Sequence, residues 1–195
     1  PILEIRPNYT TKVEQSFIRQ GSRFNSGKGS HTAQHADAPQ IAFKYTDSNF
    51  SRQEAWDLLR FFDSREGRTK PFWVMQPLTM WEPSAVTTTY IDVPDHNYRQ
   101  NIADLIKHIG IKDSDGTIHI KAVDSVTDIT DGYRISYASD PFTSDPTDVK
   151  DAAPAWLCRF GSDTLKQTWA TDTVSNSPIS IVQVLNEKTV SLSNM

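Results

Sequence analysis

The clearest hydrophobic pattern in this 195-residue chain is helical and begins near residue 51. Trp56, Leu59 and Phe62 recur at helical spacing, which predicts a helix with one buried, aromatic-rich face. Ser51 is followed three residues later by Glu54, and this pair is the capping box that typically begins a helix. We therefore expect one capped helix, around which the rest of the chain is organised.

The predicted helix covers about residues 51–65 and leads directly into a strand. Gly67 stands where a left-handed helix terminus needs glycine, and Pro71 prevents the helix from continuing. Residues 72–74, Phe-Trp-Val, have the composition of a strand that packs on the helix. The side chains expected to anchor the core are Trp56, Leu59, Phe62, Trp73, Phe160 and Trp169.

Most of the remaining periodic segments alternate between apolar and polar residues, as half-buried strands do. A short second helix is expected over about residues 98–109, closed by Gly110. The predicted strands cover residues 2–6, 13–20, 41–45, 86–93, 111–112, 117–122, 133–137, 155–160 and 179–185. The fold class indicated is mainly β, an antiparallel β-sandwich with one central α-helix and a small β-rich insertion.

Two segments are predicted to be irregular. Residues 21–39 are rich in Gly, Ser, His and Ala, so we expect a long loop at the tip of a hairpin formed by its flanking strands. Residues 139–154 are rich in Asp, Pro, Thr and Ala, which indicates a linker. The expected domains are residues 1–93 with 152–195, and a peripheral insertion over 94–151.

Composition narrows the possible partners. With 20 basic and 24 acidic residues the net charge is −4, which offers no field for binding nucleic acid or an anionic membrane. No apolar run is long enough to span a bilayer, and no signal peptide opens the sequence, so we expect assembly in a reducing cytoplasm. The single cysteine, Cys158, allows no intramolecular disulfide and is expected to be a small buried hydrophobe.

Candidate sites for metal, phosphate or catalysis are each incomplete. His31 and His35 have zinc-ligand spacing but lie in the predicted loop without completing ligands, so exposed loop histidines are favoured. Residues 27–30, Gly-Lys-Gly-Ser, lack the spacing of a phosphate-binding loop. Residues 113–116, Asp-Ser-Asp-Gly, lack the later calcium ligands and predict a hairpin turn. We therefore expect no enzymatic activity, no metal and no cofactor.

Exposed aromatic residues would support carbohydrate binding. Trp81 or Trp169 could stack on a sugar ring, as aromatic side chains do in β-sandwich carbohydrate binders. Packing in the core or in a subunit interface is the favoured interpretation of both residues.

Residues 56–68, WDLLRFFDSREGR, followed by residues 71–74, PFWV, are the first of two segments that resemble a known family. That family is the distal tail protein family of long-tailed phages with its relatives, which include the minor tail protein M group. The second is residues 156–165 with residues 179–184, which are similar to the closing strands of that family. The resemblance implies a non-catalytic β-sandwich whose copies close into a hexameric ring in the virion, joining the tail tube to the hub or tail-tip complex.

A ring subunit needs surfaces for its neighbours, and we expect residues 21–39 to contact the adjacent subunit or the tail tube. Two other functions stay open: a carbohydrate-binding module for host adhesion, and a hydrolase of cell-wall glycans. The residues suspected of lying in assembly interfaces are Arg19, Arg23, Phe24, Lys28, Arg65 and Arg68.

Overall fold

The protein is mainly β with a single helix in its described part, and this confirms the predicted fold class. The computed structural model describes residues 1–3, 11–18, 21–26, 29–34, 40–76, 81–94, 106–137 and 148–184, with backbone alone in 21–34. In chain order the elements are β1 (Ile2–Leu3), β2 (Glu14–Ile18), β3 (Gly21–Ser26), β4 (Gly29–Gln34), β5 (Gln40–Asn49), α1 (Arg52–Ser64), β6 (Phe72–Met75), β7 (Ala85–Val86), β8 (Tyr90–Pro94), β9 (His108–Asp113), β10 (Ile118–Ile129), β11 (Gly132–Tyr137), β12 (Val149–Phe160), β13 (Thr168–Trp169) and β14 (Ser175–Gln183).

The chain forms two compact units. Of the described residues, 11–72 and 157–184 belong to the first unit, and 2–3 and 73–156 belong to the second. The sequence predicts an insertion that begins at residue 94, whereas the main segment of the second unit begins at residue 73. The difference arises because β8 pairs with β7 and with β11, which ties residues 85–94 to the second unit.

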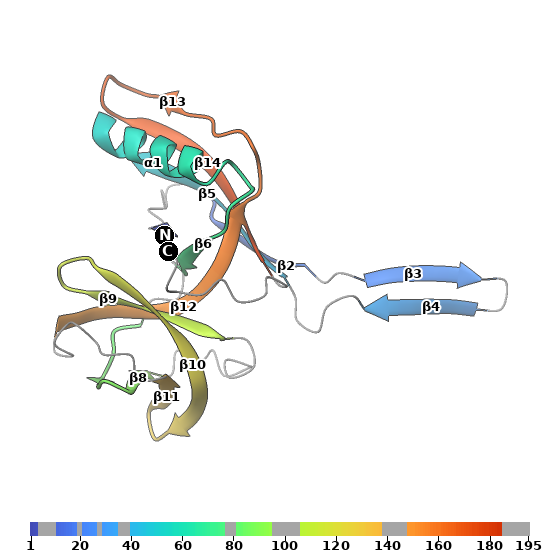
Figure 1. Ribbon diagram of the computed structural model, residues 1–195, viewed down its shortest axis with the longest axis vertical. Helices are drawn as coiled ribbons and strands as arrows, with labels where there is room; N and C mark the ends of the chain where they lie inside the picture. Colours follow the sequence, from blue (N-terminus) through green and yellow to red (C-terminus); the bar gives the residue numbers. More distant parts are fainter. Residues whose placement is uncertain are drawn as a thin grey trace. The chain divides into compact units, whose positions relative to one another are not determined.

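The first unit is an antiparallel sheet with α1 packed on one face. Its strands run in the order β2, β5, β14 and the end of β12, and Figure 1 shows α1 beside β5 and β14. In the core, Ile181 of β14 lies opposite Phe43 on one side and Phe160 on the other. The last turns of α1 add Phe61 and Phe62, whose ring centroids lie 6.2 and 4.8 Å from that of Phe160.

The ends of α1 follow from local sequence signals. Ser51 Oγ accepts the Glu54 backbone N–H at 3.1 Å, and Glu54 Oε2 accepts the Phe50 backbone N–H at 2.8 Å. After the helix, Gly67 adopts the left-handed conformation with φ +60°. The predicted helix, its N-cap and its glycine terminus are therefore confirmed.

Not all of the predicted core anchors are buried. Trp73 and Phe160 are buried, and Leu59 and Phe62 are half-buried. Trp56 and Trp169 are exposed to 55% and 44%, so their prediction as core anchors is wrong. The buried face of α1 is centred on Ala55 and Leu58, which turns Trp56 toward solvent.

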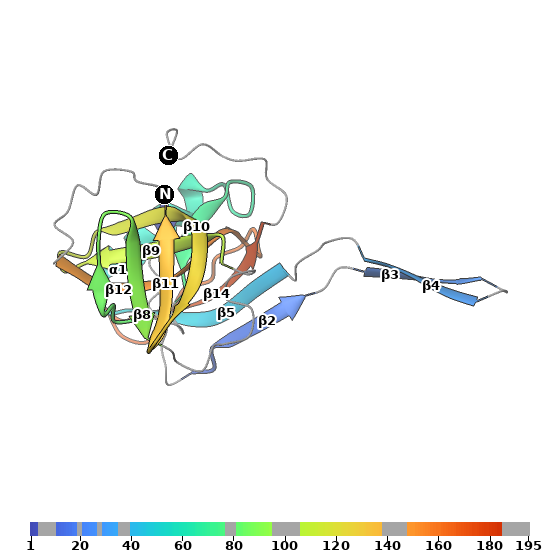
Figure 2. The ribbon, with the colours of Figure 1, turned by 90° about the horizontal axis from the view of Figure 1, so that it is seen from below.

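The second unit is an antiparallel sheet in the order β12, β9, β10, β11, β8 and β7, and β1 pairs with β6 in parallel. Figure 2 shows β8, β11 and β10 of this sheet. The core cluster of this unit is Trp81, Ile91, Val93, Ile106, Ile109, Ile111, Tyr133, Ile135, Tyr137 and Ala152.

The prediction of a loop over residues 21–39 is wrong where the backbone is described. β3 and β4 form an antiparallel ribbon, with register from Gly21 opposite Gln34 to Ser26 opposite Gly29. These strands are built from small and polar residues, so they lack the apolar alternation that predicts a strand. The pairing of the flanking strands β2 and β5 is confirmed.

The prediction of one continuous strand over residues 86–93 is also wrong. β7 and β8 are separate strands joined by a turn, in which Thr87 Oγ1 accepts the backbone N–H groups of Thr89 and Tyr90 at 3.3 and 3.0 Å. A threonine hydroxyl that competes for backbone donors favours a turn over a continuous ladder.

Two further boundaries differ from the predictions. Gly110, expected to close a helix, lies inside β9, where a Cβ would stand 3.1 Å from Met75 Cγ. The rest of the predicted second helix lies largely outside the described residues. Residues 149–154 belong to β12 and not to a linker, because Ala152 and Ala153 are buried and the Pro154 carbonyl accepts the Gln76 N–H at 2.9 Å.

Candidate functional site

Three large aromatic side chains, at the start of α1 and on the neighbouring β13, are exposed. Phe50, Trp56 and Trp169, which we call the aromatic patch, are exposed to 73%, 55% and 44%. Phe50 directly precedes the N-cap of α1, and Trp56 lies in the second turn of the helix. Soluble proteins rarely gather large apolar side chains on an open surface unless that surface binds something.

Two hydrogen bonds place β13 alongside this part of the helix. Arg52 Nε donates to the Asp172 carbonyl at 2.7 Å, and Gln167 Nε2 donates to the Ala55 carbonyl at 2.8 Å. Trp169 lies between these two attachment points in the sequence. Because Arg52 and Trp56 are four residues apart, they share one side of the helix, so both tryptophans border the same seam.

A second exposed apolar site lies on the edge strand of the first unit. Among the described strands, β2 pairs with β5 alone, which leaves its other edge without a strand partner. Phe17 and Ile18 are exposed at the end of β2. An edge strand with exposed apolar residues is a template for pairing with another chain.

The β3–β4 ribbon adjoins β2 in sequence and contains part of the predicted interface. Within the described part of the chain, these two strands pair with each other and with no further strand. Arg23 and Phe24 belong to β3 and His31 belongs to β4, as backbone positions. Arg19, Lys28 and His35 lie outside the described residues. The role of this segment in assembly stays a prediction.

Arg65 and Arg68 lie in the turn after α1 and make contacts within their own unit. The Arg68 guanidinium pairs with Asp163, Nε to Oδ2 at 2.8 Å, and the Arg68 backbone N–H donates to Asp163 Oδ1 at 3.1 Å. The Arg65 guanidinium lies 5.8 Å from the centre of the Phe61 ring. The arginine-rich turn therefore attaches the end of α1 to the loop after β12.

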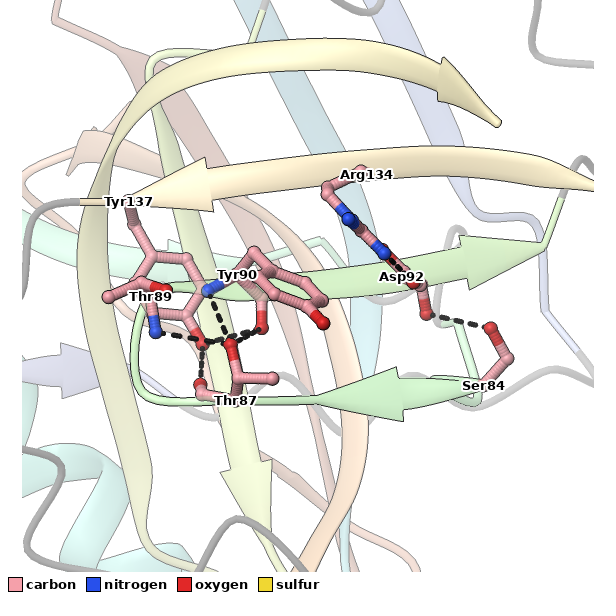
Figure 3. A network of polar contacts seen from close by, with 7 residues as sticks. All are labelled: Ser84, Thr87, Thr89, Tyr90, Asp92, Arg134 and Tyr137. Carbon is pink, nitrogen blue, oxygen red and sulfur yellow. Dashed lines mark hydrogen bonds and ion pairs between the residues drawn. The ribbon is translucent and has the colours of Figure 1, made fainter. Parts of the chain in front are cut away.

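The second unit contains a polar network between β8 and β11 (Figure 3). Arg134 Nε and Nη2 donate to the two carboxylate oxygens of Asp92 at 2.7 and 2.8 Å, and these bonds raise the pKa of Arg134. The same guanidinium covers the Tyr90 ring at 3.9 Å. Tyr137 donates its hydroxyl hydrogen to the Thr87 carbonyl at 2.7 Å, and burial raises the pKa of Tyr137 to about 12. The donors of this network bond to acceptors that also belong to it, so the network joins the strands. It offers no activated nucleophile.

The hairpin between β9 and β10 confirms the predicted turn at residues 113–116. Gly116 has φ +91°, and Asp115 Oδ1 accepts the Thr117 N–H at 2.7 Å, which lowers the pKa of Asp115. The buried Asp113 contacts His119, Oδ2 to Nε2 at 3.0 Å. Across the described residues, no group of three or more His, Cys, Asp or Glu side chains could hold a metal ion.

The structure also decides two predictions about single residues. Cys158 is fully buried, as predicted, and this burial raises the pKa of its thiol. Trp81 is only 2% exposed and lies in the core of the second unit, so the favoured interpretation of core packing is confirmed for this residue and stacking on a sugar is excluded. In the described part of the chain, no helix is both long and apolar enough to cross a bilayer.

Sequence reasoning missed Phe17, Ile18 and Phe50 as exposed residues. Their apolar character indicates burial, and their exposure depends on which strand forms the edge and where α1 begins. Neither comparison with known proteins identified a relative, because no family model and no curated protein matches the chain.

Proposed function

We propose that the protein is a structural subunit of a long-tailed phage tail, and that its copies form a ring joining the tail tube to the hub or tail-tip complex. The observation that carries this proposal is the aromatic patch of Phe50, Trp56 and Trp169. Partly exposed tryptophan and phenylalanine side chains are typical anchors of protein interfaces.

The helix and strand that resemble the distal tail family support the proposal. The resemblance rests on a capped helix, a glycine turn and an aromatic strand, and these are α1, Gly67 and β6. The same segment carries Trp56 on its solvent side. The resemblance and the exposed surface therefore belong to one structural element.

A ring requires two different surfaces on each subunit, because each copy meets its neighbours head to tail. The aromatic patch is one such surface. The edge of β2 that has no partner among the described strands supplies a second surface together with the β3–β4 ribbon. An isolated two-stranded ribbon is only marginally stable until it packs on something. We infer that the ribbon gains its stability from a neighbouring subunit or from the tail tube.

Deletion of residues 26–36 tests this inference. The deletion removes all of β4, and with it the ribbon, but none of the strands that form the sheet of the first unit. The melting temperature of the monomer should therefore stay close to wild type. Electron microscopy should then show no rings and no complete tails. A matched control is Asp128→Ser, which changes an exposed side chain of β10, a strand that belongs to neither of these surfaces. Normal assembly after the deletion would contradict the proposal.

Carbohydrate binding is the second candidate function, and the exposure of Trp169 favours it. A glycan array with the purified protein separates the two functions. Binding that Trp169→Ser abolishes, in a protein that stays monomeric and assembles no ring, would replace the tail proposal with host adhesion.

A further inference from the structure

A strip of buried polar side chains interrupts the core of the first unit. On the face of the sheet that α1 covers, β5 and β14 place Asn49 opposite Ser175 and Asp47 opposite Ser177. All four residues are buried, and both serines have 0% exposure. Along the same face of β5 the next residue is Tyr45, whose hydroxyl is also buried.

The strip lies beneath the first half of α1. The helix begins directly after β5, and its last turns pack Phe61 and Phe62 on Phe160 at the apolar end of the same face. Near the start of the helix the fully buried residue is Ala55. The large aromatic side chains that fill the space between helix and sheet at one end are thus replaced at the other end by alanine and serine.

Four polar atoms in this region have no hydrogen-bond partner within the described protein. They are Tyr45 Oη, Asn49 Nδ2, Ser175 Oγ and Ser177 Oγ. Removing such groups from solvent without a replacement partner is costly, and buried polar groups in folded proteins are normally satisfied by protein or by ordered water.

We propose that Tyr45, Asn49, Ser175 and Ser177 form a binding site for ordered water molecules between α1 and the sheet. Hydroxyl groups both donate and accept hydrogen bonds, and the Asn49 amide nitrogen donates, so the set matches a ligand that can do both. A cation fits less well for two reasons. Asp47 is the one carboxylate in the described strip, and the side-chain amide hydrogens of Asn49 would point toward the ion. The first half of α1, which carries Trp56, is then held to the sheet partly through water.

The sign of a stability change tests the site. If the serine hydroxyls bind water, Ser175→Ala and Ser177→Ala each remove a satisfied group, and the melting temperature should fall by about 2–4 °C per substitution. If the hydroxyls are buried without any partner, their removal relieves a penalty and the melting temperature stays or rises. The control is Ser16→Ala on the exposed part of β2, which should leave the melting temperature within about 1 °C of wild type.

A second measurement separates water from a direct bond to protein. Nuclear Overhauser spectroscopy of the wild-type protein should show cross-peaks between long-lived water and the backbone amide protons of Ser175 and Ser177. Loss of these cross-peaks in the double alanine variant would confirm the site. An unchanged or raised melting temperature would overturn the proposal, and so would a lowered one without water cross-peaks in the wild type.

Discussion

Replacement of Gly67 by alanine should destabilise the first unit, because this residue combines an unusual backbone conformation with a close contact. Its φ of +60° is one that residues with a Cβ rarely adopt. A Cβ at this position would stand 2.8 Å from Asp163 Oδ1 and 3.2 Å from Asp163 Cα. The second distance involves backbone, so rotation of the Asp163 side chain alone cannot relieve the overlap.

The expected cost has two parts. The left-handed conformation costs about 1–2 kcal/mol for a residue with a Cβ. Displacement of Asp163 also weakens its hydrogen bond from the Arg68 backbone N–H at 3.1 Å, which adds about 0.5–1 kcal/mol at this partly exposed position. The sum of roughly 1.5–3 kcal/mol corresponds to a fall in melting temperature of about 3–12 °C for a chain of this size.

Thermal unfolding followed by circular dichroism measures this effect, and Gly116→Ala provides the matched control. Gly116 also has positive φ, +91°, but an added Cβ there meets nothing within 4 Å. The control therefore has the conformational cost without the overlap. A loss of stability for Gly67→Ala that is equal to or smaller than the loss for Gly116→Ala would refute the assigned role of Asp163.

Three further predictions concern groups in both units. Tyr137 has a pKa raised from 10.0 to about 12, so its contribution to stability is complete below about pH 10 and is lost as the pH rises toward 12; the urea midpoint should fall between about pH 10 and 12, and less so in Tyr137→Phe, and an identical fall in both proteins would contradict this. Arg134→Ala should lower the urea midpoint more than Asp92→Ala, because it leaves the buried Asp92 carboxylate without its bidentate partner, whereas the guanidinium left by Asp92→Ala is 40% exposed and can be hydrated; the reverse order would count against the network. Cys158 should resist thiol reagents in the native protein and react fully in denaturant, because it is buried and its pKa is raised; fast native labelling would show that β12 opens.

Local signals account for the parts of the fold that were predicted from the sequence. Ser51 and Glu54 mark the start of α1, Gly67 marks its end, and the turn at residues 113–116 follows from its Asp-Gly pair. Each of these features depends on hydrogen bonds and dihedral angles within a few residues. A reader of the sequence therefore has all of the relevant information.

The features that were missed depend on pairing between distant segments. β3 and β4 form a ribbon although their residues lack alternation, and residues 149–154 join a strand because β9 lies beside them. The exposure of Trp56 depends on which face of α1 meets the sheet. Trp56 directly follows the buried Ala55 in the helix, so a small difference in the orientation of α1 decides which of the two is buried. Aromatic residues indicate burial equally well in a core and in an interface, so the sequence alone could not assign them.

The central claim is that this chain assembles through the aromatic patch, and molar mass in solution tests it most directly. Light scattering after size exclusion, across a concentration series, should show a closed species of about six subunits for the wild type. The variant Phe50→Ser, Trp56→Ser, Trp169→Ser should stay monomeric with an almost unchanged melting temperature, because all of its altered side chains are exposed. A wild type that is monomeric at every concentration, or a ring that survives these three substitutions, would contradict the claim.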